Sequence, residues 1–523
     1  MALPAFPSTL DANDLAAVVG AGVKNEQFQA GANVLPRKLL LIGTFDPSLE
    51  PLDEENIPTM VLSAEEVGAR FGKGFNLHRL AINAFAGARG IETWVIPMEE
   101  VDGAVQATGD ITFTGPATAA GTIYLYIGHN RIAVTVASGA TAAAIASDVN
   151  TAINAEANLP IQSAVNGGVP EQLDITVKSA GVYGNFVNLG FNFGFDEAFP
   201  AGVSATRTNP SGGAGVPDIN DALIAIGTGD LQNLFNFTDV VHGFTNDTTT
   251  IDKLDTYNGA GNDFVGNYAK TVARPFRNVD GNTSQSLSTL ITFTDTEIEN
   301  RTCGYICVPT SPSHPSEIGA CAMGVMARIA NNRAEESYID QVLPNIIPGP
   351  AGWTSLYDNR DLAVKNGLSP TLANPDLSVS LQNVVTFYRP ENVPVDSNGY
   401  RSQRNIAILQ NMLYNIKLNF SQEKWQGISI VADTAKVSNS SSREKARDIS
   451  SVIDDLLALA IAFEGRAWIF TAAFTIERLQ AGNLVEIRAG GTGFNATLPV
   501  ILSGEGGIFD TVVKFDTSLA VLL

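Results

Sequence analysis

The sequence predicts a multidomain α/β protein, in which an α/β body carries an inserted small β-rich domain and is followed by a C-terminal α+β domain. Three patterns lead to this prediction. Buried strand-like runs alternate with amphipathic helices in residues 35–100 and again in residues 216–380. Short strands with alternating apolar residues occupy residues 101–215 between them. Two amphipathic helices and further strands occupy residues 381–504.

Composition argues against several classes of protein. The chain has 523 residues, of which 45% are hydrophobic and 16% charged, so it can bury large cores. Its net charge of −22, without any run of Lys or Arg, argues against direct nucleic-acid binding. The longest strongly apolar run, Leu456–Phe463, is too short to cross a membrane, and the opening MALPAFPSTLDAND predicts no signal peptide. We therefore expect no membrane insertion and a reducing compartment, with the three cysteines, Cys303, Cys307 and Cys321, as buried thiols.

The first hundred residues predict an N-terminal arm followed by the first elements of the α/β body. Residues 1–34 lack a periodic pattern and predict an extended N-terminal arm. Ser63 and Glu66 have the spacing of a capping box and predict the start of a helix. The other segments expected here are a fully buried strand at 35–43, a helix at 76–88 and a second buried strand at 92–97.

The inserted domain is expected to be rich in strands. Its predicted elements are strands at 110–114, 122–127, 131–136 and 173–178 and one helix at 141–156. The Pro- and Gly-rich run at 210–217 is typical of a linker back to the body.

The α/β pattern then resumes. The predicted elements are helices at 221–226, 251–257 and 317–330 and strands at 237–242 and 301–308. Residues 344–376, which are rich in Pro, Gly and Asn, predict long surface loops. The simplest topology inserts the β-rich domain into a loop of one discontinuous body.

The C-terminal third is expected to begin with a strand at 384–388. A helix at 400–420 follows, with one apolar stripe formed by Ile406, Leu409, Leu413, Ile416 and Phe420. Ser442 is placed to cap a second helix, and strands are expected at 484–488 and 495–502.

Residues 505–523 predict a terminal strand with two alternating faces. Val513 and Phe515 are assigned to the buried face, with Lys514 and Asp516 outward. Glycines at 504, 506 and 507 precede the strand and favour a flexible link. An apolar terminal strand must pair and pack with another sheet, and a sheet of a neighbouring subunit can serve. The candidate inter-subunit residues are Gly507, Ile508, Phe509, Val512, Val513 and Phe515.

No catalytic, cofactor-binding or metal-ligating set is predicted. The Gly-Lys-Gly at 72–74 lacks the spacing of a phosphate loop and is typical of a helix end. The four histidines, His78, His129, His242 and His314, have no metal-ligand spacing, and His314 in a Pro/Ser loop is expected at the surface. Asp454 and Asp455 point about 100° apart on a helix, so they predict solvated surface rather than a carboxylate pair.

A set of short motifs, in order, resembles the N-terminal half of contractile-tail sheath proteins, in particular the Mu-like subgroup. The motifs are LPRKLLLIG (35–43), AEEVGARFGKG (64–74), WVIP (94–97), GDITFTG (109–115), GTIYLYIG (121–128) and YGNFVNL (183–189). The order of elements in the C-terminal third also fits this family.

The resemblance implies a structural subunit without a cofactor. Sheath proteins stack as hexameric rings around a tail tube, and their contraction drives the tube through a cell envelope. It implies that residues 381–504 form a polymerisation domain, that the terminal arms complete sheets in neighbours, and that the partners are further copies, the tube, the baseplate and the terminator. It places the protein in a virion assembled in the host cytoplasm, or in a phage-derived injection particle. A hydrolase using His314 and a surface-array protein remain alternatives from other classes.

Overall fold

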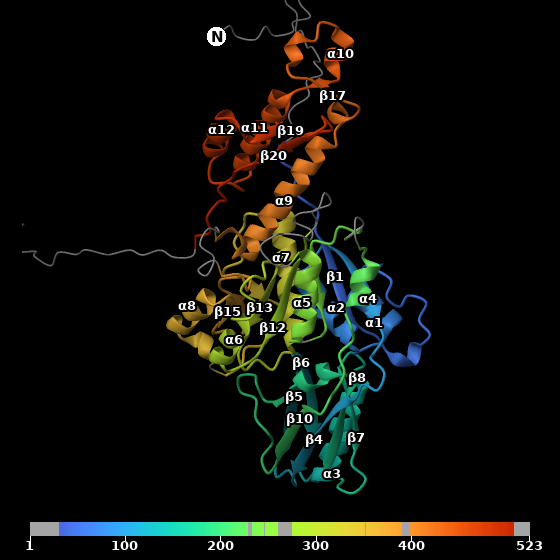
Figure 1. Ribbon diagram of the computed structural model, residues 1–523. Helices are drawn as coiled ribbons and strands as arrows, with labels where there is room; N and C mark the ends of the chain where they lie inside the picture. The colour runs from blue at the N-terminus through green and yellow to red at the C-terminus, as the bar shows by residue number, and fades with distance from the viewer. Residues whose placement is uncertain are drawn as a thin grey trace, which may run out of the picture.

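The computed structural model describes residues 31–228, 233–244, 246–259, 275–350, 352–389 and 398–506. The chain forms three parts in a row (Figure 1): a central body, a β-rich module at one end, and a C-terminal part at the other. The predicted N-terminal arm falls outside the described residues except for 31–34, and the predicted terminal strand except for 505–506.

The body is built on a nine-stranded sheet with the order β14-β16-β15-β13-β12-β11-β1-β3-β2. The strands from β15 to β3 run parallel. At one edge β2 pairs antiparallel with β3; at the other, β16 pairs antiparallel with β15, and β14 pairs antiparallel with β16. The strands are β1 (Lys38–Thr44), β2 (Thr59–Val61), β3 (Glu92–Met98), β11 (Asp239–His242), β12 (Arg277–Asn282), β13 (Cys303–Cys307), β14 (Val342–Leu343), β15 (Leu368–Ala373) and β16 (Val379–Leu381). The mixed α/β fold predicted from the sequence is confirmed.

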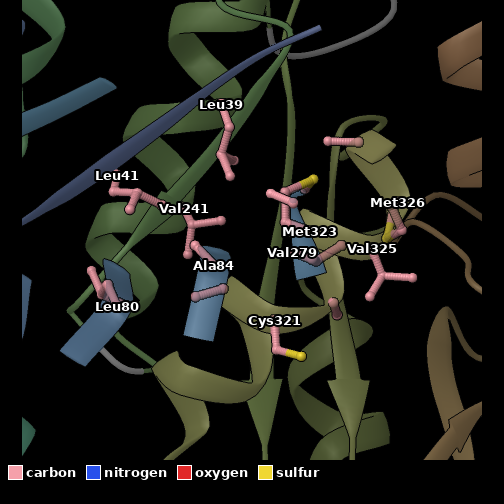
Figure 2. Packing of buried hydrophobic residues seen from close by; sticks show 14 of the residues in the cluster. Leu39, Leu41, Leu80, Ala84, Val241, Val279, Cys321, Met323, Val325 and Met326 are labelled. Atoms are coloured by element: carbon pink, nitrogen blue, oxygen red, sulfur yellow. The ribbon is translucent and has the colours of Figure 1, made fainter. Parts of the chain in front are cut away.

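Helices cover both faces of this sheet, which explains the continuous apolar run of β1. Leu39 and Leu41 pack into one core, part of which Figure 2 shows, and Leu40 and Ile42 pack into the other. The first core is covered by α1 (Ala64–Phe71), α2 (Asn76–Gly87) and α7 (Pro315–Asn332). The second is covered by α4 (Asn220–Ala225), α5 (Thr248–Asn258), α6 (Leu287–Thr294) and α8 (Tyr357–Lys365).

The β-rich module has two antiparallel sheets around one core. One sheet has the order β10-β4-β8-β7 and the other β6-β5-β9. Its elements are β4 (Gln106–Thr114), β5 (Gly121–Ile127), β6 (Asn130–Val136), α3 (Ala142–Ala155), β7 (Ile161–Val165), β8 (Gln172–Ala180), β9 (Leu189–Phe191) and β10 (Ser204–Ser211). Val105 and Ala214 exchange two backbone hydrogen bonds, so the chain enters and leaves the module at one place.

The C-terminal part has a separate core around Trp468. Its elements are α9 (Gln403–Phe420), β17 (Ser429–Ile430), α10 (Ser440–Glu444), β18 (Ala446–Arg447), α11 (Ile449–Gly465), α12 (Ala472–Gln480), β19 (Val485–Ile487) and β20 (Phe494–Ala496). Across the described residues, no helix has both the length and the apolarity to cross a membrane.

Several expected elements are corrected. Residues 344–376 are not all surface loop, because they contain α8 and the buried β15, which lies within the sheet. Residues 384–388 form no strand; Val385 makes a single bridge to Ser402. The strands that were not predicted include β7, β9, β10 and β12. Of the strand expected at 495–502 only its start, in β20, is present.

The start of the second C-terminal helix is also corrected. Ser442 lies inside the short α10 and does not cap α11. Asp448 is the N-cap of α11, and Ser451 completes the capping box. Asp455 on α11 is more than solvated surface, since it accepts hydrogen bonds from Asn419, Lys424 and Trp425.

Candidate functional site

His314 is buried, contrary to the surface position expected from its Pro/Ser loop. It is the N-cap of α7, and its Nδ1 accepts a hydrogen bond from the backbone of Ser316 at 3.2 Å. Its Nε2 lies 3.0 Å from the carbonyl oxygen of Tyr183, whose ring covers the imidazole. Burial lowers the pKa of His314 to about 4, so the side chain is neutral at pH 7. A base sealed in this way cannot reach a substrate, which disfavours the hydrolase alternative.

The crevice where a doubly wound sheet would bind a ligand is filled. Such ligands bind beyond the carboxyl ends of the strands where the strand order reverses, here between β1 and β11. Ala180, Val182 and Tyr183 of the module lie in this crevice and leave a cavity of only about 10 Å³. Among the described residues, no group of three His, Cys, Asp or Glu side chains is arranged to hold a metal ion. The geometry therefore favours a structural junction at this edge.

A buried ion pair fixes the module to the body at this junction. Arg79 on α2 and Glu317 on α7 form two hydrogen bonds, of 2.7 and 3.0 Å, with side chains that are 1% and 2% exposed. Arg79 also donates to the side chain of Asn130 and to the carbonyl of Asn158, both in the module. Although desolvation opposes it, the Arg79 charge holds the pKa of Glu317 well below its usual range. The pair thus connects two body helices with the start of β6 and with the loop at Asn158 in the module.

The module also provides a hydrogen-bond acceptor for a backbone N–H at the start of α2. Phe75, the N-cap residue, makes no side-chain hydrogen bond. The Oγ of Ser179 on β8 instead accepts a hydrogen bond from the backbone N–H of Asn76 at 2.9 Å. A helix of the body is therefore capped by a side chain of the module.

Replacing this cap is expected to weaken the junction modestly. We expect Ser179→Ala to lower the free energy of unfolding by about 1 kcal/mol, because the Asn76 N–H loses its partner in a buried place. Thermal unfolding and hydrogen exchange at the start of α2 measure the effect. Ser138→Ala on the exposed surface is the matched control. Equal unfolding temperatures for the two variants would contradict the capping role.

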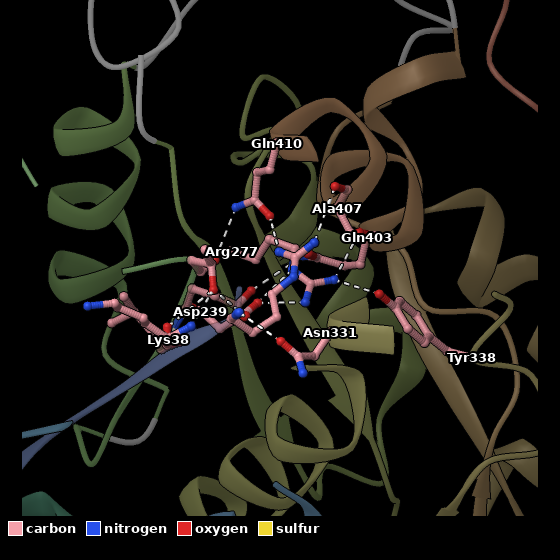
Figure 3. Close-up of polar contacts among 12 residues, drawn as sticks. Lys38, Asp239, Arg277, Asn331, Tyr338, Gln403, Ala407 and Gln410 are labelled. Carbon is pink, nitrogen blue, oxygen red and sulfur yellow. Dashed lines mark hydrogen bonds and ion pairs between the residues drawn. The ribbon is translucent and has the colours of Figure 1, made fainter. Parts of the chain in front are cut away.

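The opposite, amino edge of the sheet carries a second buried polar junction, with α9 (Figure 3). The amide of Gln403 donates to the carbonyl of Thr302 at 3.0 Å, and that of Gln410 donates to Pro275 at 2.8 Å. Asn411 accepts a hydrogen bond from the backbone of Leu35 at 2.7 Å. The buried face of α9 is thus largely polar. The predicted apolar stripe is only partly confirmed, because Ile406 is buried but Leu409 and Leu413 are half-buried.

Two buried arginines and one buried carboxylate lie at the centre of this second junction. Asp239 contacts the Nε and Nη2 of Arg277 at 2.7 and 2.6 Å, and both side chains are 0% exposed. Arg277 also donates to the Tyr338 hydroxyl at 2.7 Å and to the Gln403 carbonyl at 3.2 Å. Arg37 donates to Gln410 and to the carbonyl of Ala407. Burial lowers the pKa of Arg37 to about 10, and the charge of Arg277 acts in the same direction. The junction therefore contains one excess buried positive charge.

The sequence-predicted inter-subunit residues Gly507, Ile508, Phe509, Val512, Val513 and Phe515 lie outside the described residues. The chain leading to them is fixed on the C-terminal part, where Ile469 bridges Leu502. Glu505 accepts hydrogen bonds from Ser337 at 2.5 Å and from Ser402 at 3.3 Å. The candidate arm therefore leaves the described structure beside the junction between the body and α9.

Sequence reasoning missed the charged residues of the two junctions, which are Arg37, Arg79, Asp239, Arg277 and Glu317. Asp239 lies in the predicted strand at 237–242, where a charged residue in a buried strand was the available signal. Arg277 lies in β12, which was not predicted, so no such signal pointed to it. Glu317 looked like an ordinary acidic residue in a first helical turn. Arg79 lies on the predicted helix at 76–88, where a charged side chain usually faces solvent.

Comparisons with known proteins support one family. No family model matches the chain. The chain is 25% identical over 360 residues to the Mu-like prophage FluMu tail sheath protein of Haemophilus influenzae, which covers 68% of this chain and 69% of that protein. This match confirms the resemblance to phage tail sheath proteins that was predicted from the sequence.

Solved structures that resemble the chain at lower similarity include a sheath tail protein from Listeria innocua, with 12% identity and a TM-score of 0.45 over 91% of this chain and 94% of that one. A chain of the anti-feeding prophage baseplate has 9% identity and a TM-score of 0.43 over 96% and 100%.

Proposed function

We propose that this chain, which is related in sequence to a Mu-like phage tail sheath protein, is a structural subunit of a contractile tail sheath. The 360-residue match is the observation that carries the proposal. In this function the subunits form hexameric rings stacked around a tail tube. The sheath is assembled in an extended state and shortens to drive the tube through a cell envelope. The free-energy difference between two packings of the same subunit supplies the work, and no nucleotide is needed.

The linear arrangement of the three parts suits this function. We assign residues 35–100 and 216–380 to the body, 101–215 to the inserted domain and 381–504 to the polymerisation domain. The module and the C-terminal part lie at opposite ends of the body (Figure 1). The C-terminal part would face the tube and the module the outside of the sheath. The two buried junctions would keep each subunit rigid while contacts between subunits change.

The hairpin of β19 and β20 is a suitable acceptor for a donated arm. Val485 and Ile487 of β19 pair with Ala496 and Phe494 of β20, and these two strands make a sheet of their own. A two-stranded sheet is marginally stable alone and gains from added strands. An arm of a neighbouring copy, from residues 1–34 or 505–523, would extend this sheet.

The partners proposed are further copies of the chain, the tail tube, the baseplate and the terminator. The protein would belong to a virion tail made in the host cytoplasm. A phage-derived contractile injection particle is the second candidate, since it requires the same subunit.

Negative-stain microscopy of the purified full-length chain tests the proposal. Tubular polymers of stacked rings are expected. Flat sheets would indicate a surface-array protein, and single particles that remain monomeric at high concentration would contradict a sheath subunit.

Removing the predicted arm is expected to abolish polymerisation. Deletion of residues 507–523 spares Glu505 and its contacts with Ser337 and Ser402, so the described fold should remain intact. We expect soluble subunits without tubes by microscopy and sedimentation. The variant Lys514→Ala/Asp516→Ala, on the face assigned outward, is the matched control and should still form tubes. Tubes of normal length from the deletion would refute the arm.

A further inference from the structure

Two groups of exposed apolar side chains lie on the body, one at the edge strand β2 and one on the helix α8. The β2 patch consists of Leu49, Ile57, Met60 and Leu62 on and beside the edge strand β2. The α8 patch consists of Leu356, Tyr357 and Leu362, at the start of α8 and along it. Leu62 is 76% exposed and Tyr357 64% exposed, although both adjoin regular elements. Grouped exposed apolar side chains of this size mark interaction surfaces.

Other surfaces of the body are already covered in the described chain. Helices cover both faces of the sheet, the module covers its carboxyl edge, and α9 covers its amino edge. Among the described residues, the side chains of the β2 patch and of the α8 patch remain exposed. Figure 1 shows α1 and α8 on opposite sides of the body, so a copy cannot bring its own two patches together.

We propose that the β2 patch of one copy docks on the α8 patch of the next copy. The two patches differ in composition and in position, so the contact is heterologous and repeats from copy to copy. Such a contact closes into a ring or continues as a helix. The inference deepens the proposed sheath function and rests on it.

Charge distribution favours this head-to-tail contact over pairing of like patches. The exposed carboxylates of Glu50 and Asp53 lie between residues of the β2 patch in the sequence, and no ion pair is found for them in the described chain. The basic residues that follow are already paired, Arg70 with Glu54 and Glu66, and Lys73 with Glu65. Two β2 patches face to face would therefore repel each other. Helix α8 carries balanced charges, since Asp358 and Asp361 are matched by Arg360 and Lys365. It can approach the acidic edge without that repulsion.

Cross-linking between copies tests the orientation of the contact. The variants are Leu62→Cys, Tyr357→Cys and the double variant, each assembled as full-length chain and treated with a short bis-maleimide. The native cysteines should not react, because all three are buried and their thiol pKa values are raised by that burial.

The double variant is expected to give a ladder of cross-linked copies, and a mixture of the two single variants is expected to give only dimers. Leu62→Cys alone is expected to give none. Dimers from Leu62→Cys alone, or no ladder from assembled double variant, would overturn the proposal.

A charge substitution tests the energetic role of the contact. Met60→Asp adds a charge to the β2 patch and is expected to raise the concentration needed for assembly at least tenfold, measured by sedimentation. Phe195→Asp is the matched control, since Phe195 is 92% exposed on the module, away from both patches. Unchanged assembly of Met60→Asp would overturn the edge contact while leaving the sheath function intact. Failure of the unmodified chain to form tubes would instead refute the sheath function.

Discussion

Asp239→Asn is expected to lower the free energy of unfolding of the body by about 3–5 kcal/mol, because it leaves Arg277 and Arg37 buried without a counter-charge. Asp239 is the carboxylate that Arg277 contacts at 2.6 Å, and desolvation already lowers the pKa of Arg37 to about 10. The variant should show an earlier unfolding transition of the body in scanning calorimetry. It should also show faster hydrogen exchange in α9, whose Gln403 carbonyl Arg277 holds.

Two further variants isolate the charge effect. Asp361→Asn removes an exposed ion pair with Lys365 and should cost less than about 1 kcal/mol. The double variant Asp239→Asn/Arg277→Met should recover part of the loss, because it leaves only one buried cation. A double variant less stable than Asp239→Asn would show that the hydrogen bonds of Arg277, rather than its charge, determine stability.

Glu317→Gln is expected to loosen the module from the body, at a cost of about 3–5 kcal/mol at neutral pH, because Arg79 keeps its buried charge and loses its partner. The loss should appear as faster proteolysis near residues 101–103 and 212–217, which connect the two parts. Faster hydrogen exchange is expected in α2. Glu66→Gln, which weakens a half-buried ion pair with Arg70, is the control for a helix-surface carboxylate.

The pH dependence gives a second measure of the same pair. The Glu317 pKa in the folded state lies below its usual value of about 4.3, mainly through the Arg79 charge acting against desolvation. A depressed carboxyl pKa contributes stability that is present above the unfolded-state pKa and is lost as pH falls below it. The native chain should therefore lose junction stability below about pH 4.5, and Glu317→Gln should lack this part of the pH dependence. Identical acid profiles for the two proteins would contradict the role of the pair.

Local patterns were sufficient for much of the fold. The apolar run at 35–43 predicted a fully buried strand, and Ser63 with Glu66 predicted the start of α1, where Ser63 is the N-cap. The change from alternating α and β segments to short strands at 101–215 predicted the β-rich module. Each of these signals is contained in neighbouring residues, because helix and strand periodicities act over a few positions.

Other segments could not be interpreted locally. β12, with the sequence RNVDGN, is fully buried yet mostly polar, and β15 lies in a Pro- and Asn-rich region. Their burial depends on neighbouring strands that are distant in sequence. His314 looked exposed because its loop is rich in Pro and Ser, whereas the module covers that loop in the folded chain.

The sequence by itself was sufficient to predict the α/β class, the β-rich module and the resemblance to tail sheath proteins. These properties follow from local patterns and from short motifs in a fixed order. Only the tertiary structure decided how the parts are joined. Arg79 with Glu317, and Arg277 with Asp239, are separated by 238 and 38 residues. A buried charge is stable only beside a partner, and the fold alone brings such distant partners together.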